Sequence, residues 1–217
     1  MQRLHNHAFY LYGVIVGLAI REALVDTGPH VFIPSNVAPW KIHLEALRLI
    51  VFLATIGCFY FGAGVYFDKV HLGESSTNYS KKSYGLDFVM GLIHFLFFFA
   101  WALTLTNHSR NSLGISPFYG FLSAVFLYDL VWLIANIRFD AAHEIKMWAV
   151  MCLIVWCLAT GLFFTVRAIT NNDVLAEEIS LGLYACYLVG DAVELFSGKP
   201  FFLTLLQLLL PQNTRLT

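Results

Sequence analysis

Ionisable side chains inside long apolar stretches are the residues of this sequence best placed to do chemistry. Asp129 is flanked by Phe-Leu-Tyr and Leu-Val-Trp-Leu-Ile, and His94 lies in another apolar stretch. Asp191 and Glu194 are three residues apart, so a helix would place both carboxylates on one face. An ionisable side chain at membrane depth costs about 2.5–3.5 kcal/mol on insertion scales, so it has to find a partner, face a bundle interior or line water.

Carboxylates in such positions attract cations or relay protons, and a histidine adds a group that ordinarily titrates near neutral pH. We therefore predict a transport path through the membrane that runs from the inner half to the outer end along these residues: Asp129, Asp191, Glu194, His94, Arg21 and Glu22. A second interpretation stays open, in which each of these side chains is bonded to a neighbouring helix and only stabilises the bundle.

A further pair of charges lies at the start of the second apolar stretch. Glu45 and Arg48 are three residues apart and share a helix face. We predict that both form structural ion pairs, Glu45 with Arg21 and Arg48 with Glu22. The path contains ligand types that suit zinc or manganese, but no spacing defines a site, and no metal or other cofactor is predicted.

Membrane-spanning helices are the elements that must position these side chains. The 217-residue chain is 59% hydrophobic and only 12% charged, whereas a soluble domain carries about 25% charged residues. A span needs about 20 mainly apolar residues, and lipid cannot satisfy the amides of irregular backbone. The sequence therefore predicts an all-α integral membrane protein, a single polytopic domain over residues 1–217, with six transmembrane helices at 8–25, 45–67, 84–105, 117–137, 147–166 and 177–196.

Two segments outside the predicted spans are candidates for contact with a partner. The segment 28–40 contains three prolines and Trp40, which favours an ordered loop at the membrane interface. Residues 201–210 are apolar but too few to span, so we predict a short interfacial helix or a cap on the bundle.

Sequence patterns recur at a spacing close to 61 residues. The pattern D-x-V-x-L begins at Asp68, Asp129 and Asp191, which are 61 and 62 residues apart. The pattern V-M-x-L-I occurs at 89–93 and again at 150–154, an offset of 61. Three repeated helical hairpins would explain both patterns, and chance matching within a small apolar alphabet is the competing explanation. Repeats of this kind build many membrane transport proteins, with the site at the repeat interface.

Basic residues favour one orientation in the membrane. With the N-terminus inside, eight of the 13 lysines and arginines lie on the cytoplasmic side, which predicts cytoplasmic N- and C-termini. The net charge of −1 gives no electrostatic reason to bind nucleic acid. The absence of GxSxG, HExxH and Walker motifs disfavours an enzyme, although an intramembrane enzyme that uses the carboxylates and His94 with a metal stays open.

Two function classes follow from these features. The leading hypothesis is a small channel or transporter for a cation, a proton or a small solute, which we expect to form a homo-oligomer in the lipid bilayer. The alternative is a non-transporting accessory, scaffold or regulatory subunit that binds a protein partner through the 28–40 loop or the C-terminal tail.

Overall fold

The computed structural model describes residues 2–32, 39–67, 81–137 and 143–197, and every regular element in them is an α-helix. There are six helices in these ranges: α1 Gln2–Phe32, α2 Pro39–Phe67, α3 Lys81–Ala102, α4 Pro117–Ile137, α5 His143–Thr170 and α6 Asp173–Ser197. The all-α prediction is therefore confirmed for the described chain.

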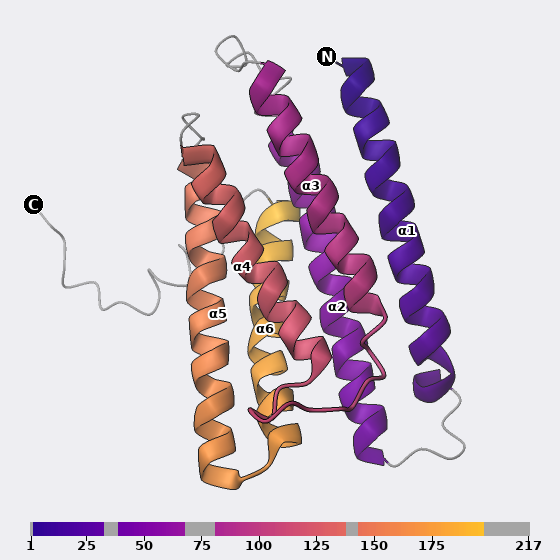
Figure 1. The fold of residues 1–217 in the computed structure, drawn as a ribbon, viewed down its shortest axis with the longest axis vertical. Coiled ribbons are helices and arrows are strands. Elements are labelled where there is room, and N and C mark those ends of the chain that lie inside the picture. The colour runs from indigo at the N-terminus through magenta and orange to yellow at the C-terminus, as the bar shows by residue number, and fades with distance from the viewer. Residues whose placement is uncertain (1, 33–38, 68–80, 138–142, 198–217) are drawn as a thin grey trace, which may run out of the picture.

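The six helices form an up-and-down bundle in which consecutive helices run in opposite directions (Figure 1). The most extensive pairings are α5 with α6, α2 with α6, α1 with α3, α1 with α2, and α4 with α5. The α2–α6 pair thus connects a group formed by α1, α2 and α3 to a group formed by α4, α5 and α6. The two-residue connection 171–172 explains why α5 and α6 are antiparallel neighbours.

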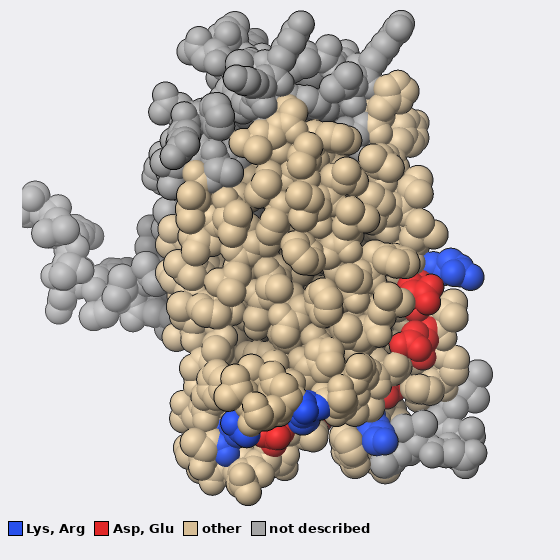
Figure 2. Space-filling model, in the orientation of Figure 1, with Lys and Arg blue, Asp and Glu red and all other residues tan. Residues whose placement is uncertain are grey.

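Three helices contain stretches long and apolar enough to cross a membrane, which indicates a multi-pass membrane protein. These stretches are Pro39–Val65, Gly85–Ala102 and Val150–Thr170, and α4 adds the shorter apolar stretch Pro117–Trp132. In Figure 2 the described charged side chains gather in the lower half of the view, and the rest of the visible described surface is free of them. The other predicted spans stay predictions.

Most helices extend beyond the apolar stretches that predicted them, and α4 matches its prediction of 117–137. The clearest difference is α1, which continues through Pro29 to Phe32. The predicted 28–40 loop is therefore helical at both ends, and its centre, 33–38, lies outside the described residues. Gly28 explains the continuation, because the clash of a proline ring with the preceding residue partly involves a Cβ that glycine lacks.

The even-numbered helices meet in the core through aromatic rings. The rings of Phe59 on α2 and Phe126 on α4 have centroids 6.2 Å apart, and Phe126 lies 4.8 Å from Tyr184 on α6. These ring contacts do not test the predicted repeat of helical hairpins, which stays a prediction. The Asp68 motif and the predicted 201–210 segment lie outside the described residues.

A close approach of α1 to α3 provides a test of the packing. A Cβ at Gly91 would lie 2.8 Å from Tyr12 Oη. Tyr12 is fully buried and its hydroxyl donates to the Phe88 carbonyl at 2.8 Å, so the ring cannot move aside without losing this bond. We expect Gly91→Ala to lower stability by about 1–3 kcal/mol through overpacking, measured as Tm in detergent.

The matched control is Gly161→Ala on α5, where an added Cβ meets nothing within 4 Å. Alanine also favours a helix over glycine by up to about 1 kcal/mol, so this variant should keep or raise the Tm. Equal losses of Tm in the two variants would contradict the tight α1–α3 contact.

Candidate functional site

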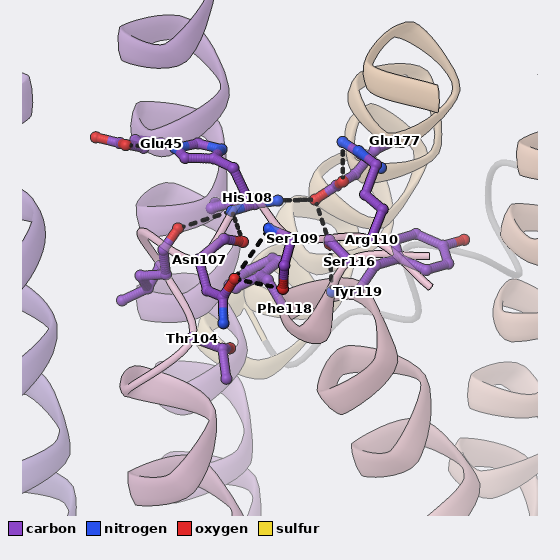
Figure 3. Close-up of polar contacts among 12 residues, drawn as sticks. Glu45, Thr104, Asn107, His108, Ser109, Arg110, Ser116, Phe118, Tyr119 and Glu177 are labelled. Atoms are coloured by element: carbon purple, nitrogen blue, oxygen red, sulfur yellow. Dashed lines mark hydrogen bonds and ion pairs between the residues drawn. The ribbon is translucent and has the colours of Figure 1, made fainter. Parts of the chain in front are cut away.

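The segment that joins α3 to α4, residues 103–116, crosses one end of the bundle between α2 and α6 (Figure 3). Its polar groups meet charged side chains from both helices. We name this group the loop-end cluster, and it contains these residues: Glu45, Arg48, His108, Arg110, Ser116 and Glu177.

Arg48 on α2 is the centre of the loop-end cluster and is fully buried. Its Nε donates to Oε1 of Glu177 at 2.9 Å, and its Nη2 lies 2.8 Å from the same oxygen. Its Nη1 donates to the carbonyls of Leu105 and Asn107 at 2.9 and 3.0 Å. The guanidinium also lies 5.3 Å from the centroid of the Phe118 ring, a cation–π contact. One side chain thus connects α2 to α6, to the 103–116 segment and to the start of α4.

Glu177 on α6 completes the network from the opposite helix. Its Oε1 also accepts a hydrogen bond from Ser116 Oγ at 2.9 Å, and its Oε2 lies 2.8 Å from Arg110 Nη2. Arg110 Nη1 in turn donates to the Gly114 carbonyl at 2.8 Å. Gly114 has φ +75°, a left-handed conformation in which a side chain would be strained. The segment is therefore folded back on itself to present Arg110 to α6.

Glu45 binds the same segment from the start of α2. Its Oε1 lies 2.7 Å from His108 Nε2, and its Oε2 lies 3.1 Å from His30 Nδ1 on α1. A further bond to α1 comes from Thr106, whose hydroxyl donates to Asp26 Oδ2 at 2.6 Å. Side-chain bonds therefore hold the 103–116 segment to α1 and α2 as well as to α6.

Glu45 and Arg48 were predicted to form structural ion pairs, and the structure gives Arg48 an ionic partner and Glu45 two imidazole contacts. The partners differ from the predicted ones. Arg48 pairs with Glu177 rather than Glu22, and Glu45 contacts two histidines rather than Arg21. Both residues lie near the start of α2, on one face of the helix. Their partners depend on which helices that face contacts, and in the structure it contacts α6 and the 103–116 segment.

Sequence reasoning missed Glu177, Arg110 and His108 as members of a site. One signal was available, because the predicted topology places the start of the second helix, the third loop and the start of the sixth helix on one side of the membrane. Two arginines and two glutamates gathered on that side indicate a balanced charge network. Their direct contacts could not be derived from the topology.

A second polar site lies inside the bundle, away from the loop-end cluster. Asp129 on α4 and His94 on α3 are 1% and 2% exposed, and His94 Nδ1 lies 3.6 Å from Asp129 Oδ1. Among the described residues the Asp129 carboxylate has only the weakly donating thiol of Cys152 as a hydrogen-bond donor, and His94 Nε2 has no hydrogen bond. Aromatic rings enclose the imidazole, among them Phe59 at 4.6 Å, Phe98 at 5.0 Å and Tyr128 at 5.3 Å between centroids. We call these two residues the buried pair.

Asp191 on α6 is half-buried and lies within electrostatic range of Asp129 and of Cys152 on α5. The structure therefore gathers three of the predicted path residues, His94, Asp129 and Asp191, in one region. Glu194 belongs to α6, but its side chain lies outside the described residues.

Arg21 and Glu22, the predicted outer end of the path, lie on α1 in contact with each other. Arg21 Nη1 is 3.6 Å from Glu22 Oε2, and the side chains are 69% and 33% exposed. Both side chains lie on the surface of the bundle, away from the buried pair. The structure thus separates the predicted path residues into an interior group and a surface group.

The chemistry available to the interior group is proton or cation exchange. A carboxylate only accepts hydrogen bonds, and an imidazole can give or take a proton. Among the described residues there is no group of three or more His, Cys, Asp or Glu side chains arranged to hold a metal ion.

Comparison with known proteins adds no guide to either site. The chain matches no family model, no curated protein and no solved structure. The function has to be argued from the side chains themselves.

The Glu177 carboxylate gives a test of the loop-end cluster. Glu177→Gln leaves the fully buried guanidinium of Arg48 without its countercharge. Removing one partner of a buried ion pair costs about 3–5 kcal/mol, and we expect a loss of this size in thermal or denaturant unfolding of the purified protein.

Glu178→Gln, one residue further along α6 on a half-buried side chain, is the matched control and should change stability little. Adding Arg48→Met to Glu177→Gln removes the stranded charge, so the double variant should lose less than the sum of the two single losses. Additive losses would contradict the direct coupling of Arg48 with Glu177.

Proposed function

We propose that this protein is a membrane transport protein that passes protons or another cation through the helix bundle, with the buried pair as its central polar step. The observation that carries the proposal is the Asp129 carboxylate, which is 1% exposed and has only the weakly donating thiol of Cys152 as a hydrogen-bond donor among the described residues. Its Oδ1 lies 3.6 Å from His94 Nδ1.

Energetic reasoning favours a transport role for Asp129 over a structural one. A structural carboxylate in a membrane bundle gains stability by accepting hydrogen bonds, as Glu177 does from Arg48 and Ser116. Asp129 carries the desolvation cost of a buried acid, and the Cys152 thiol is a weak donor that compensates for little of it. A buried polar group without adequate hydrogen bonds costs about 1–3 kcal/mol, and more when it is charged. Groups that reduce stability in this way are found at functional sites.

Depth and neighbours support the same proposal. His94 packs against Phe59, which lies inside the apolar stretch Pro39–Val65 of α2. Asp191 is within electrostatic range of Asp129 on the side of α6, and a second carboxylate nearby provides the next position for a moving cation or proton. We place Asp191 and Glu194 on the inner half of this path.

The orientation proposed from the basic residues, with six spans and both termini in the cytoplasm, assigns the loop-end cluster to the opposite side of the membrane. There the 103–116 segment is held by Arg48, Arg110 and Glu177. In this proposal the cluster closes the outer end of the bundle, and opening would require these ion pairs to separate.

Flux through reconstituted protein tests the proposal. In liposomes that carry a pH-sensitive dye and an imposed K⁺ diffusion potential, the wild type should accelerate proton entry over empty liposomes. Asp129→Asn should reduce the rate at least tenfold, because an amide cannot carry the proton, while the Tm stays equal or rises. A structural role for Asp129 predicts the reverse, a lower Tm with unchanged flux.

Each variant of the buried pair has a matched control. His43→Gln changes an exposed histidine near the start of α2 and is the control for His94→Gln. Glu178→Gln is the control for Asp129→Asn. Both controls should keep wild-type flux. A wild-type protein that passes no proton, Na⁺ or K⁺ would overturn the transport proposal and favour the accessory-subunit alternative.

A further inference from the structure

One face of α6 carries polar side chains from the loop-end cluster to the region of the buried pair. Their positions alternate in steps of three and four residues, which places them on the side of the helix where a bundle normally has apolar residues. The residues are Glu177, Ser180, Tyr184, Tyr187 and Asp191. The first four are at most 5% exposed. A mostly buried polar stripe therefore follows α6 for about 21 Å, at 1.5 Å per residue.

The stripe begins beside the loop-end cluster, where hydroxyl groups from three helices meet. Tyr119 is in the first turn of α4, and its backbone N–H donates to Ser116 Oγ at 3.2 Å (Figure 3). The Tyr119 hydroxyl lies near those of Ser180 on α6 and Thr160 on α5, and it is within electrostatic range of Glu177. None of these three hydroxyls is well aligned for a hydrogen bond with a described residue.

The next hydroxyl along α6 belongs to Tyr184, which is fully buried. The centroid of its ring is 6.2 Å from that of Tyr119, and its hydroxyl lies near Ser123 on α4. Tyr184 is also within electrostatic range of Cys152 on α5. It therefore connects the hydroxyls at the end of the bundle with the thiol that contacts Asp129.

Cys152 and Tyr187 complete the connection to the buried pair. Cys152 Sγ lies 3.6 Å from Tyr187 Oη, and the same thiol is the donor to Asp129. Both residues are within electrostatic range of Asp191. Buried polar groups thus follow one another from Glu177 to Asp129 along α4, α5 and α6. We name their hydroxyl-bearing part the hydroxyl line, and it contains these residues: Tyr119, Ser180, Thr160, Tyr184, Ser123 and Tyr187.

Packing alone does not account for the hydroxyl line. Phenylalanine in place of Tyr119 or Tyr184 would fill nearly the same volume, and valine has nearly the shape of Thr160. Either replacement would avoid the cost of about 1–3 kcal/mol that a buried polar group carries when its hydrogen bonds are inadequate. A continuous row of such groups supports a role for the hydroxyls themselves.

We infer that the hydroxyl line is the outer half of the transport path and that the path carries protons, an inference that rests on the transport function proposed above. A hydroxyl both donates and accepts. A proton that binds to its free lone pair releases the group's own proton to the next acceptor, so one proton enters and one leaves. The line thus takes the place of Arg21 and Glu22, which lie on the surface.

The same groups are poor ligands for a metal cation. Such an ion exchanges its water shell for several oxygen ligands gathered at one point, as carboxylates or rings of carbonyls provide them. The hydroxyl line offers only a few neutral hydroxyls at any level, between the carboxylates of Glu177 and Asp129. This difference is the reason to choose the proton among the cations of the proposed function.

Removal of single hydroxyls tests the inference in the dye-loaded liposomes. Tyr119→Phe and Tyr184→Phe should each reduce proton entry at least tenfold, because a phenyl ring cannot pass a proton on. The Tm should stay equal or rise, since each variant removes a poorly bonded buried hydroxyl. The matched control is Tyr60→Phe, on a half-buried tyrosine of α2 outside the line, which should keep wild-type flux.

A pair of variants at Thr160 separates the hydroxyl from the shape of the side chain. In a Ser180→Ala background, Thr160 carries the remaining hydroxyl beside Tyr119. Thr160→Val in this background keeps the branched shape and should reduce proton entry at least tenfold. Thr160→Ser keeps the hydroxyl and should stay within about threefold of the wild type. Equal flux in the two double variants would overturn the inference.

The outcomes distinguish this inference from the proposed function. If Asp129→Asn stops proton entry but both tyrosine variants keep it, the hydroxyl line is wrong and the transport function stands. A wild type that passes Na⁺ or K⁺ but no protons has the same meaning. Losses of flux and Tm together in the tyrosine variants would assign the hydroxyls a structural role and overturn the inference. A wild type that passes no ion overturns both proposals.

Discussion

Lipid offers no water to a charged side chain, and this constraint governs the ionisable residues that the helices place at membrane depth. The described bundle handles it in three ways. Arg48 and Glu177 are buried and 2.8 Å apart with further hydrogen bonds. Asp129 is buried beside His94, with only the weak thiol of Cys152 as a described hydrogen-bond donor. Arg21 stands on the surface of α1. The dense set of charged contacts around Arg48 indicates a structural role, whereas the weakly bonded Asp129 carboxylate supports the proposed role in transport.

The loop-end cluster shows what a dense network of ion pairs and hydrogen bonds achieves. The attraction within a buried ion pair often only balances the cost of removing its charges from water, so pairs of this kind contribute geometry as much as stability. Arg48 is bonded to α6 through Glu177 and to the 103–116 segment through backbone carbonyls. The same segment is bonded to Asp26 on α1. Helices distant in sequence are therefore fixed relative to one another at this end, and any motion that separates α2 from α6 there must break charged contacts.

The helices and the burial of Asp129 could be predicted because both depend on local sequence. The stretch 117–137 is mainly apolar, and α4 has those bounds. Asp129 has apolar residues on both sides, so its burial follows from the sequence. The limits of α1 could not be predicted, because hydropathy detects only the residues in lipid, and this helix continues through Gly28 and Pro29. The described residues leave the three-hairpin repeat untested, since the first of its aspartates lies outside them.

The sequence by itself determined that the chain crosses a membrane as apolar helices and that several acids and bases lie within them, since length and composition suffice for both. Only the tertiary structure decided which charges meet. The partners of Arg48 and Glu45 are Glu177 and His108, which are 129 and 63 residues away. Their contact requires a particular rotation and register of each helix. Those are set by side-chain packing across the whole bundle, and no local pattern contains them.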